Sequence, residues 1–201
     1  MSSTRVDRKE KKEHTRGRII EAAFRIMGRD GLFSARTLDI AEAAGVAHGT
    51  VFAHFQRRDD LLCSVIDELG QRVAYRLHLL AEAGHGVRDI LWAHLKGLAE
   101  HEQLYVRLIT EGRLLPRTPR MSFVMIQSAI SLHLGAAVET ETSAGLLRPM
   151  PLHLLFNTWI GLVHHYLVNG DLFSADGSLV LKQHGATLVD HFYSLIAAQS
   201  S

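Results

Sequence analysis

The stretch of sequence that decides the fold is residues 37–55, TLDIAEAAGVAHGTVFAHF. Two short segments with helical apolar spacing flank Gly45, where the chain has to turn sharply. Glycine adopts a positive φ at such a turn at no steric cost. Four residues earlier, Ala41 is small enough for two helices to cross closely. This spacing predicts a helix-turn-helix, in which the second helix covers residues 48–54.

The apolar residues of this stretch predict which face of the second helix is buried. Val51 is placed to contact Ile40 and Val46, and these three side chains would form the small core that joins the two helices. The opposite face of the second helix is then free. In a helix-turn-helix, that free face enters the major groove of DNA.

The composition is that of a globular helical protein. Of the 201 residues, 47% are hydrophobic, 21% are charged and 7% are aromatic, and four are prolines. Apolar and polar residues do not alternate over any sustained run, so we expect an all-α fold. The single cysteine, Cys63, excludes an internal disulfide and fits a reducing cytoplasm.

The N-terminal segment and the hydropathy of the chain indicate where the protein works. Residues 1–18 are too charged for a secretory signal, and no apolar run is expected to reach the length that spans a membrane. We therefore expect a cytoplasmic protein with no membrane partner.

Charge is unevenly distributed along the chain. Residues 1–62 carry 12 Lys and Arg against 9 Asp and Glu, whereas residues 63–201 carry 10 against 12. Two interpretations of the N-terminal segment stay open. It is either a frayed, solvated terminus or an arm whose cations neutralise DNA phosphates or enter the minor groove. These cations are Arg5, Arg8, Lys9, Lys11 and Lys12.

Helical apolar spacing, together with Gly and Pro punctuation, divides the chain into about nine helices. Thr37 is a candidate N-cap of the second helix, because its hydroxyl can accept a hydrogen bond from a free backbone N–H. The other segments expected to be helical are 11–29, 48–54, 58–82, 87–101, 102–112, 120–142, 152–168 and 178–198.

Several spaced residues of the N-terminal third occur together in a fixed order: Ile19-Ile20, Ala22-Ala23, Gly31, Ile40-Ala41, Ala44-Gly45-Val46, Gly49-Thr50-Val51-Phe52, His54-Phe55 and Asp60-Leu61-Leu62. In this order they resemble the TetR family of transcriptional regulators. The resemblance implies an N-terminal arm and helix-turn-helix DNA-binding domain over residues 1–57. It also implies a helical effector-binding and dimerisation domain over residues 58–201.

The resemblance further implies a function and partners. Members of the family are homodimers that mostly repress transcription by covering a palindromic operator on double-stranded DNA. A small-molecule effector in the helical domain changes the spacing of the two DNA-binding heads. We therefore expect a ligand-responsive regulator, most simply a repressor, rather than an enzyme.

The resemblance also implies which residues face DNA: Arg36, Thr37, Ala47, His48, Gly49, Thr50, Phe52, His54 and Arg58. Two of them depart from the family's pattern. Phe52 stands where a Tyr is usual, which removes a hydroxyl that reaches a phosphate, and Ala47 stands where Ser or Thr usually caps the helix. For His54, a structural role at the helix end and a DNA contact both stay open. Arg58 stands where the family usually has Lys.

Large side chains of the second domain are candidates for the lining of an effector cavity, again by the resemblance: Trp92, His101, Tyr105, Arg107, Ile109, Met125, Phe156, Trp159 and His164. Core packing is the alternative for each apolar residue taken singly. Aromatic and methionine walls favour a small, largely apolar or aromatic effector. His101, Arg107, Glu111 or His164 would supply the polar contact that orients it.

The last two helices each carry an apolar stripe: Leu155, Trp159, Leu162 and Val163 on one, and Leu181, Leu188, Phe192 and Leu195 on the other. A monomer would bury one face of each helix within itself. The family's arrangement would pack both helices against the same pair of a second subunit, which gives a homodimer through the last two helices.

No sequence motif indicates catalysis, a cofactor or a metal. A Gly-rich phosphate loop and a nucleophile elbow are missing. His101 begins a segment like the zinc motif HExxH, but Tyr105 takes the place of the second histidine. Three alternatives to a DNA-binding regulator stay open: a helical small-molecule-binding protein without DNA binding, a His-based metal sensor, and a helical enzyme that uses some of the 13 histidines.

Overall fold

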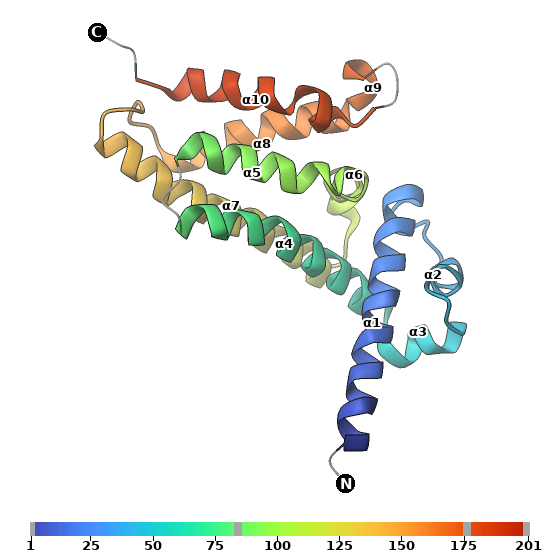
Figure 1. The fold of residues 1–201 in the computed structure, drawn as a ribbon. Helices are drawn as coiled ribbons and strands as arrows, with labels where there is room; N and C mark the ends of the chain where they lie inside the picture. Colours follow the sequence, from blue (N-terminus) through green and yellow to red (C-terminus); the bar gives the residue numbers. More distant parts are fainter. Residues whose placement is uncertain (1–2, 83–85, 175–177, 199–201) are drawn as a thin grey trace.

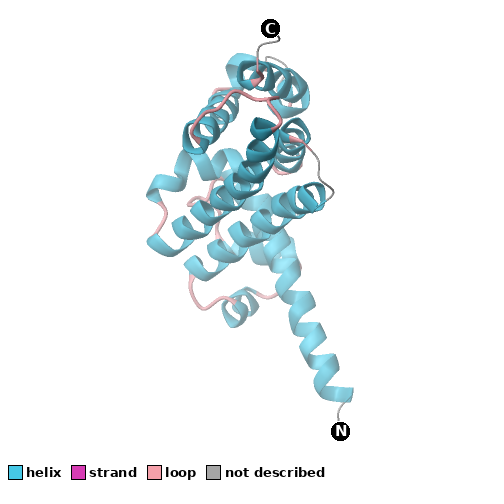
Figure 2. Ribbon diagram, turned by 90° about the vertical axis from the view of Figure 1, so that its left-hand side faces the viewer, coloured by secondary structure: helices cyan, strands magenta, loops and turns pink. Residues whose placement is uncertain are grey.

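The structure is a computed structural model that describes residues 3–82, 86–174 and 178–198. Over these residues the fold is all-α, as expected, and no strand occurs among them (Figure 2). The helices are α1 (Ser3–Asp30), α2 (Thr37–Ala44), α3 (His48–His54), α4 (Arg58–Glu82), α5 (Val87–Ala99), α6 (Glu102–Glu111), the 3-10 helix η1 (Gly112–Leu114), α7 (Arg117–Ser143), α8 (Leu152–Val168), α9 (Gly170–Phe173) and α10 (Val180–Ile196).

The first three helices form a head at one end of the molecule (Figure 1). The C-terminal half of α1 packs against α2 and α4 and buries one stripe of side chains: Ile19, Ala22, Ala23, Ile26 and Met27. The N-terminal part of α1 projects past α3 away from the rest of the molecule. We call α1–α3 the head and α4–α10 the body. The domain boundary expected after residue 57 falls where α4 begins, and the division stays a prediction.

The body is layered around α5. Figure 1 shows α4 and α7 on one side of this helix and α8 and α10 on the other, and α5 packs against α4, α7 and α10. Eight of its 13 residues are buried: Val87, Ile90, Leu91, Ala93, His94, Leu95, Gly97 and Leu98. α5 is therefore the central helix of the body, and the helices packed around it shield most of its side chains from solvent.

Several expected helix bounds shift in the structure. The first helix begins at Ser3 rather than at residue 11, and residues 8–14 are exposed on it. The arm is thus a solvent-exposed helical extension; the side chain of Arg5 lies outside the described residues. Thr37 does not cap α2, because Arg36 occupies the N-cap position and makes no side-chain cap bond. A 3-10 helix after α6 and the four-residue α9 were not expected.

The apolar stripes of α8 and α10 lie mostly inside the chain itself. Six of their eight side chains are buried: Leu155, Trp159, Val163, Leu181, Leu188 and Phe192. Leu162 is half-buried and Leu195 is exposed. The stripes therefore complete the core of this chain, and any surface for a second subunit has to come from the opposite faces of these helices.

α7 is long and apolar enough to cross a membrane by length and composition. Its most apolar 18-residue window has a mean hydropathy of 1.5, and 22% of that window is buried. The expectation that no apolar run reaches this length is therefore wrong. In the fold α7 packs along α4, where Ile126 lies against Gly70 and joins a buried stripe with Ile130, Leu134 and Val138.

Candidate functional site

The turn between α2 and α3 has the geometry that the sequence predicts. Gly45 has φ 63° and ψ 41°, the left-handed conformation that ends α2, and the N–H of Val46 donates to the carbonyl of Ala41 at 3.0 Å. Arg18 of α1 donates to the carbonyls of Ala44 (2.5 Å) and Gly45 (3.2 Å). A Cβ on Gly45 would lie 2.7 Å from Nη2 of Arg18. The positive φ therefore favours glycine here, and a Cβ would also displace the flexible end of the Arg18 side chain.

The two faces of α3 are as expected. Val51 is buried together with Ile40, and Val46 is half-buried beside them. On the opposite face, His48 and Gly49 are exposed, and Phe52 is 47% exposed with its ring edge-on to the ring of His48, at 5.1 Å between centroids. The free face of α3 thus presents an imidazole and an apolar ring side by side. Thr50 between them is half-buried.

The starts of α2 and α3 contact each other through two residues assigned to DNA. Oγ1 of Thr37 lies 3.0 Å from Nε2 of His48, so the hydroxyl that was expected to cap α2 binds the imidazole instead. Ala47 is the N-cap of α3 and makes no side-chain cap bond, in agreement with the loss of a Ser or Thr hydroxyl. This contact fixes the orientation of His48 relative to α2.

The two arginines assigned to DNA have different surroundings. Arg36 is exposed and pairs with Asp39 at 2.9 Å. Arg58 is half-buried and donates to three backbone carbonyls of the loop before α2: Leu32 (2.6 Å), Ala35 (2.7 Å) and Phe33 (3.3 Å). Arg58 therefore fixes this loop within the head. Its contact with DNA stays a prediction, and so does that of His54, which is half-buried at the end of α3.

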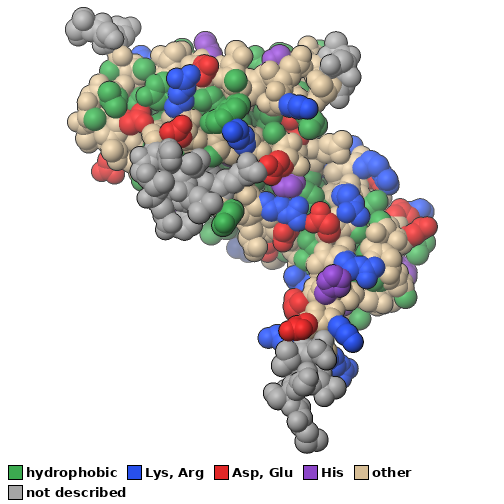
Figure 3. All heavy atoms as spheres, in the orientation of Figure 1, with side chains coloured by type: hydrophobic (Ala, Val, Ile, Leu, Met, Phe, Trp, Pro, Cys, Tyr) green, Lys and Arg blue, Asp and Glu red, His purple; other side chains and the backbone are tan. Residues whose placement is uncertain are grey.

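On the visible face, Lys and Arg side chains are more frequent over the head and along α1 than over the body (Figure 3). Arg8, Lys9, Lys11 and Lys12 are exposed on the part of α1 that projects past α3. This surface would lie next to the backbone of a duplex that α3 enters.

Three of the residues assigned to an effector meet in the centre of the body. The hydroxyl of Tyr105 lies 2.9 Å from Nε2 of His164, and both Tyr105 and Trp159 are fully buried. Nε1 of Trp159 donates to Nδ1 of His94 at 3.0 Å. Burial lowers the pKa of His94 to about 3 and that of His164 to about 4, and it raises the pKa of Tyr105 well above its usual value. All three groups are uncharged near neutral pH.

The remaining residues assigned to an effector are spread over the body. Phe156 is buried one helical turn before Trp159, and Ile109 is half-buried against the core. Met125 is 63% exposed on the surface of α7. Trp92 lines a surface groove between α5 and α10, with Nζ of Lys96 5.1 Å from its ring centroid. The structure does not bring these four side chains together.

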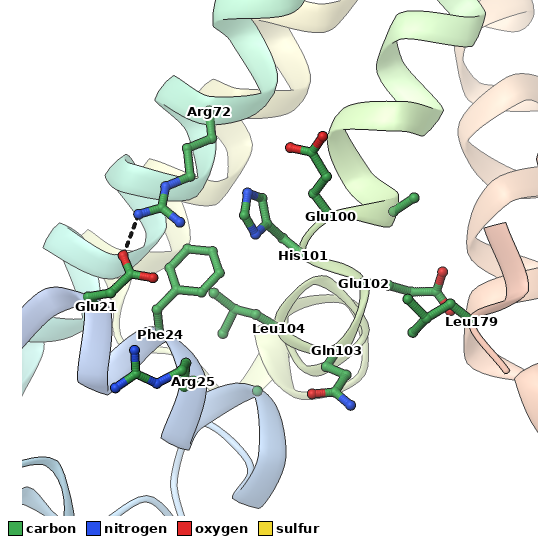
Figure 4. Close-up of a pocket in the computed structure, with 12 residues that line it drawn as sticks. Glu21, Phe24, Arg25, Arg72, Glu100, His101, Glu102, Gln103, Leu104 and Leu179 are labelled. Carbon is green, nitrogen blue, oxygen red and sulfur yellow. Dashed lines mark hydrogen bonds and ion pairs between the residues drawn. The ribbon is translucent and has the colours of Figure 1, made fainter. Parts of the chain in front are cut away.

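His101 and Arg107 lie at the junction of head and body instead. The ring of Phe24 in α1 is held between His101, at 4.9 Å between centroids, and the guanidinium of Arg72 in α4, at 4.8 Å. Arg72 also pairs with Glu21 at 2.5 Å (Figure 4). Glu21, Phe24, Arg72 and His101 line a cleft of about 370 Å³ between α1, α4 and the start of α6, and Arg107 lies outside this lining.

The other side of the junction is made by hydrogen bonds from α6 to the end of α1. Arg107 donates to the carbonyls of Gly28 (3.3 Å) and Arg29 (3.0 Å). The carboxylate of Glu111 accepts from the N–H of Leu32 at 2.9 Å. One side of α6 thus contacts α1, while Tyr105 on the same helix reaches the centre of the body.

Sequence reasoning missed His94 and Glu102. His94 lies within the apolar stripe of α5, and a histidine in such a stripe is the one signal that could have indicated it. Glu102 accepts from the N–H groups of Val180 (2.8 Å) and Leu181 (3.0 Å), and so holds the start of α10. Burial raises its pKa, although these two hydrogen bonds act in the opposite direction. Nothing in the sequence connects residue 102 with residues 180 and 181.

Comparison with known sequences identifies the head. The family described as "Bacterial regulatory proteins, tetR family" matches residues 19–65. The HTH-type transcriptional regulator TtgR of Pseudomonas putida is 39% identical over 61 residues, which are 30% of this chain and 29% of that protein. The HTH-type transcriptional repressor Rv3405c of Mycobacterium tuberculosis is 31% identical over 101 residues, half of each chain. The chain thus spans between about a third and a half of these relatives.

Comparison with solved structures covers about nine-tenths of the chain. The TetR family regulator PfmR from Thermus thermophilus has a TM-score of 0.72 at 15% identity, over 91% of this chain and 99% of that one. FadR from Bacillus subtilis, solved in complex with stearoyl-CoA, has a TM-score of 0.71 at 18% identity, over 89% and 98%. At such identities the likeness is one of fold. Residues 19–65 therefore belong to the TetR family of bacterial regulatory proteins, and over about nine-tenths of its length the chain shares the fold of the solved TetR-family regulator PfmR.

Proposed function

We propose that the chain is a cytoplasmic, DNA-binding transcriptional regulator without enzymatic activity. It acts as a homodimer on a palindromic operator, as a repressor that a small, largely apolar or aromatic effector releases. The observation that carries the proposal is the geometry of the head, in which Gly45 turns the chain so that the face of α3 with His48 and Phe52 stays free. The names of the relatives TtgR and Rv3405c, a regulator and a repressor, support it.

The DNA-facing surface is made by the start of α3 and its flanks. A Cβ on Gly49 would meet nothing within 4 Å, so the backbone of α3 can approach a duplex closely at this point. His48 and Thr50 supply polar groups for base edges or phosphates, whereas Phe52 can only pack. Arg36 and the exposed cations of α1 supply the phosphate contacts that the lost Tyr hydroxyl would otherwise share.

Effector and DNA would be coupled through α6. Tyr105 places this helix in the centre of the body, and Arg107 and Glu111 tie it to the end of α1. A ligand that moves α6 therefore changes the position of α1 relative to the body. It can shift the balance between two head spacings only by binding one of them more tightly. FadR, a structural neighbour solved with stearoyl-CoA, supports a ligand in the body.

The homodimer would form through the outward faces of α8 and α10, because the inward stripes are used within the chain. On α8 the outward face is Leu154, Thr158, Gly161 and His165, and on α10 it is Thr187, His191 and Leu195. A Cβ on Gly161 would meet nothing within 4 Å, which leaves room for a second helix to cross closely. Two copies of this pair would make a four-helix bundle.

A mobility-shift titration against the DNA upstream of its own gene tests the proposal. The wild-type chain is expected to bind with an affinity that falls steeply with salt, and the variant His48→Ala, Thr50→Ala is expected to bind about tenfold more weakly or worse. Lys182→Ala, an exposed cation of α10, is the matched control and should bind like the wild type. Equal binding by all three proteins would contradict the assignment of this face.

A further inference from the structure

A buried hydrogen-bond donor in the centre of the body has no acceptor among the residues that the structure describes. His94 is 1% exposed, and its Nδ1 accepts from Nε1 of Trp159 at 3.0 Å. A neutral imidazole whose Nδ1 accepts carries its proton on Nε2. That atom is buried and has no hydrogen-bond partner among the described residues. Because an unpaired buried N–H is costly and rare, this one calls for an acceptor that the described residues do not supply.

The surroundings of His94 are aromatic, with few other polar groups. Tyr105 from α6 and His164 from α8 hydrogen-bond to each other, and the side chain of Gln127 from α7 lies close to the hydroxyl of Tyr105. The ring of Phe123 lies 5.9 Å from that of Tyr105, and the ring of Phe192 lies 5.1 Å from that of Trp159, between centroids. Side chains of α5, α6, α7, α8 and α10 thus converge on an apolar interior in which Nε2 of His94 is the unsatisfied donor.

The body also has a groove on its surface. It lies between α7 and α8, has a volume of about 430 Å³, and is lined by Val124, Gln127, Ser128, Ser131, Leu132, Leu152 and Phe156. Two of its residues connect it to the centre. The side chain of Gln127 lies close to the hydroxyl of Tyr105, and Phe156 lies one helical turn before Trp159 on α8. A ligand in the groove would reach Trp159 and His94 only if the Phe156 ring moved aside.

We propose that the body binds an uncharged, largely apolar ligand whose carbonyl or ether oxygen accepts a hydrogen bond from Nε2 of His94, and that the ligand enters between α7 and α8. This inference rests on the proposed function, because it names the chemistry by which the effector is recognised. An apolar ligand body contacts the rings of Trp159, Phe156 and Phe123, and a single oxygen satisfies the buried donor.

The same site rejects carboxylates. Burial keeps the pKa of His94 at about 3 and that of His164 at about 4, so neither imidazole offers a positive charge near neutral pH. A carboxylate would lose its hydration without gaining a counter-charge, which is far more costly than burying a neutral carbonyl. The ligand class is therefore ketones, esters, lactones and ethers rather than free acids.

Three aromatic probes of nearly equal shape test the inference on the full-length protein. Acetophenone carries a carbonyl oxygen, α-methylstyrene has a CH₂ group in its place, and benzoate carries a charge. Binding is followed by Trp fluorescence and calorimetry, and the Nε2 proton of His94 by NMR of the ¹⁵N-histidine-labelled protein. Acetophenone is expected to bind about tenfold more tightly than α-methylstyrene and to shift the Nε2 proton, and benzoate is expected to bind most weakly. Equal affinities of the first two probes, or no binding of acetophenone, would overturn the inference.

The variant His94→Asn removes the Nε2 donor and can keep the hydrogen bond that Trp159 donates. An asparagine amide oxygen can replace Nδ1 as the acceptor for Trp159, but its short side chain does not reach the position of Nε2. The variant is expected to keep its helicity and to bind acetophenone and α-methylstyrene equally. Lys96→Ala, at an exposed position of the same helix, is the control and should keep the preference for acetophenone. A preference retained in His94→Asn would exclude His94 as the donor.

The mobility-shift titration on the same protein samples separates this inference from the proposed function. DNA binding without any preference for acetophenone would overturn the inference alone. A preference for acetophenone without DNA binding would support the site and overturn the regulator. If the NMR signal of the Nε2 proton shows a bound water that acetophenone does not displace, the donor serves the fold only and the inference is wrong.

Discussion

Arg107 donates a hydrogen bond to the carbonyl of Arg29 at 3.0 Å, across a sequence separation of 78 residues. The bond joins the middle of α6 in the body to the last turn of α1 in the head. Two residues before Arg107, Tyr105 is fully buried in the centre of the body. In the proposed mechanism, a change of position at the centre would reach α1 over less than one turn of a single helix.

This link predicts the effect of Arg107→Ala. Removing the guanidinium leaves the carbonyls of Gly28 and Arg29 without their partners, which is expected to lower the free energy of unfolding by about 1–2 kcal/mol. Amide hydrogen exchange over residues 28–32 should become faster, because this segment loses its attachment to α6. Arg113→Ala in the exposed part of η1 is the control. Identical exchange in the two variants would show that the contact does not hold α1.

Replacing each of two glycines of the head with alanine should change the stability of the protein in opposite directions. Gly45→Ala places a Cβ at positive φ and 2.7 Å from Arg18, so we expect a loss of about 1–2 kcal/mol in stability. Gly49→Ala meets open space within a helix and should gain about 0.5–1 kcal/mol. The added methyl group nevertheless lies on the DNA-facing side, and DNA binding should weaken about tenfold. Thermal unfolding combined with mobility shifts measures both effects, and unchanged DNA affinity in Gly49→Ala would move the interface elsewhere.

The three carbonyl contacts of Arg58 predict that a lysine at this position cannot keep the full stability of the head, although it keeps the positive charge. Arg58→Lys keeps a cation for phosphate, but an ammonium group cannot reach three carbonyls as a guanidinium does. We expect Arg58→Lys to lose about 1 kcal/mol of stability and Arg58→Ala to lose more. Arg57→Ala, whose side chain is exposed, should have little effect. If Arg58→Ala weakens DNA binding without any loss of stability, Arg58 is a DNA contact and its three carbonyl bonds contribute nothing.

The buried imidazoles predict how stability depends on pH. His94 and His164 have pKa values of about 3 and about 4 in the fold, below the usual 6.5 of the unfolded chain. The unfolded state therefore takes up protons first as the pH falls. The stability from keeping these groups neutral is complete above pH 6.5 and is lost progressively as the pH falls, down to about pH 4 for His164 and about pH 3 for His94. His164 alone accounts for about 3 kcal/mol of this loss.

Chemical unfolding at a series of pH values measures this slope. The double variant His94→Asn, His164→Gln lacks both titrating groups, while its amide oxygens can still accept from Trp159 and Tyr105. Its stability should change much less between pH 6.5 and pH 4 than that of the wild type. If the two slopes are the same, other groups are responsible for the acid sensitivity.

A helix could be predicted from the sequence where an apolar stripe or flanking Pro, Gly or Asn residues mark its bounds. α8 was predicted with its observed bounds, because Pro151 precedes it and Asn169 follows it. The start of α1 was missed, because its first residues are charged and exposed and so show no apolar stripe. The helix-turn-helix was predicted well, since its core is local and Gly45 marks the turn.

The candidate sites could be predicted only where sequence neighbours are also spatial neighbours. The role of Thr37 was missed because its hydroxyl contacts His48, eleven residues away, rather than the backbone of its own helix. His101 and Arg107 lie near Tyr105 in sequence, but the spacing does not say which side of α6 faces α1. His94 was missed for a similar reason, since its partner Trp159 lies 65 residues further on.

The central claim is that the head binds a specific DNA sequence. Its most direct test is the affinity of the wild-type chain for its own upstream DNA. This affinity is compared with that for a scrambled duplex of the same composition over a range of salt concentrations. The prediction is an affinity near nanomolar at physiological salt, about a thousandfold tighter than for the scrambled duplex, with a logarithm that falls linearly with the logarithm of salt concentration. Equal affinity for the two duplexes at every salt concentration would contradict the claim.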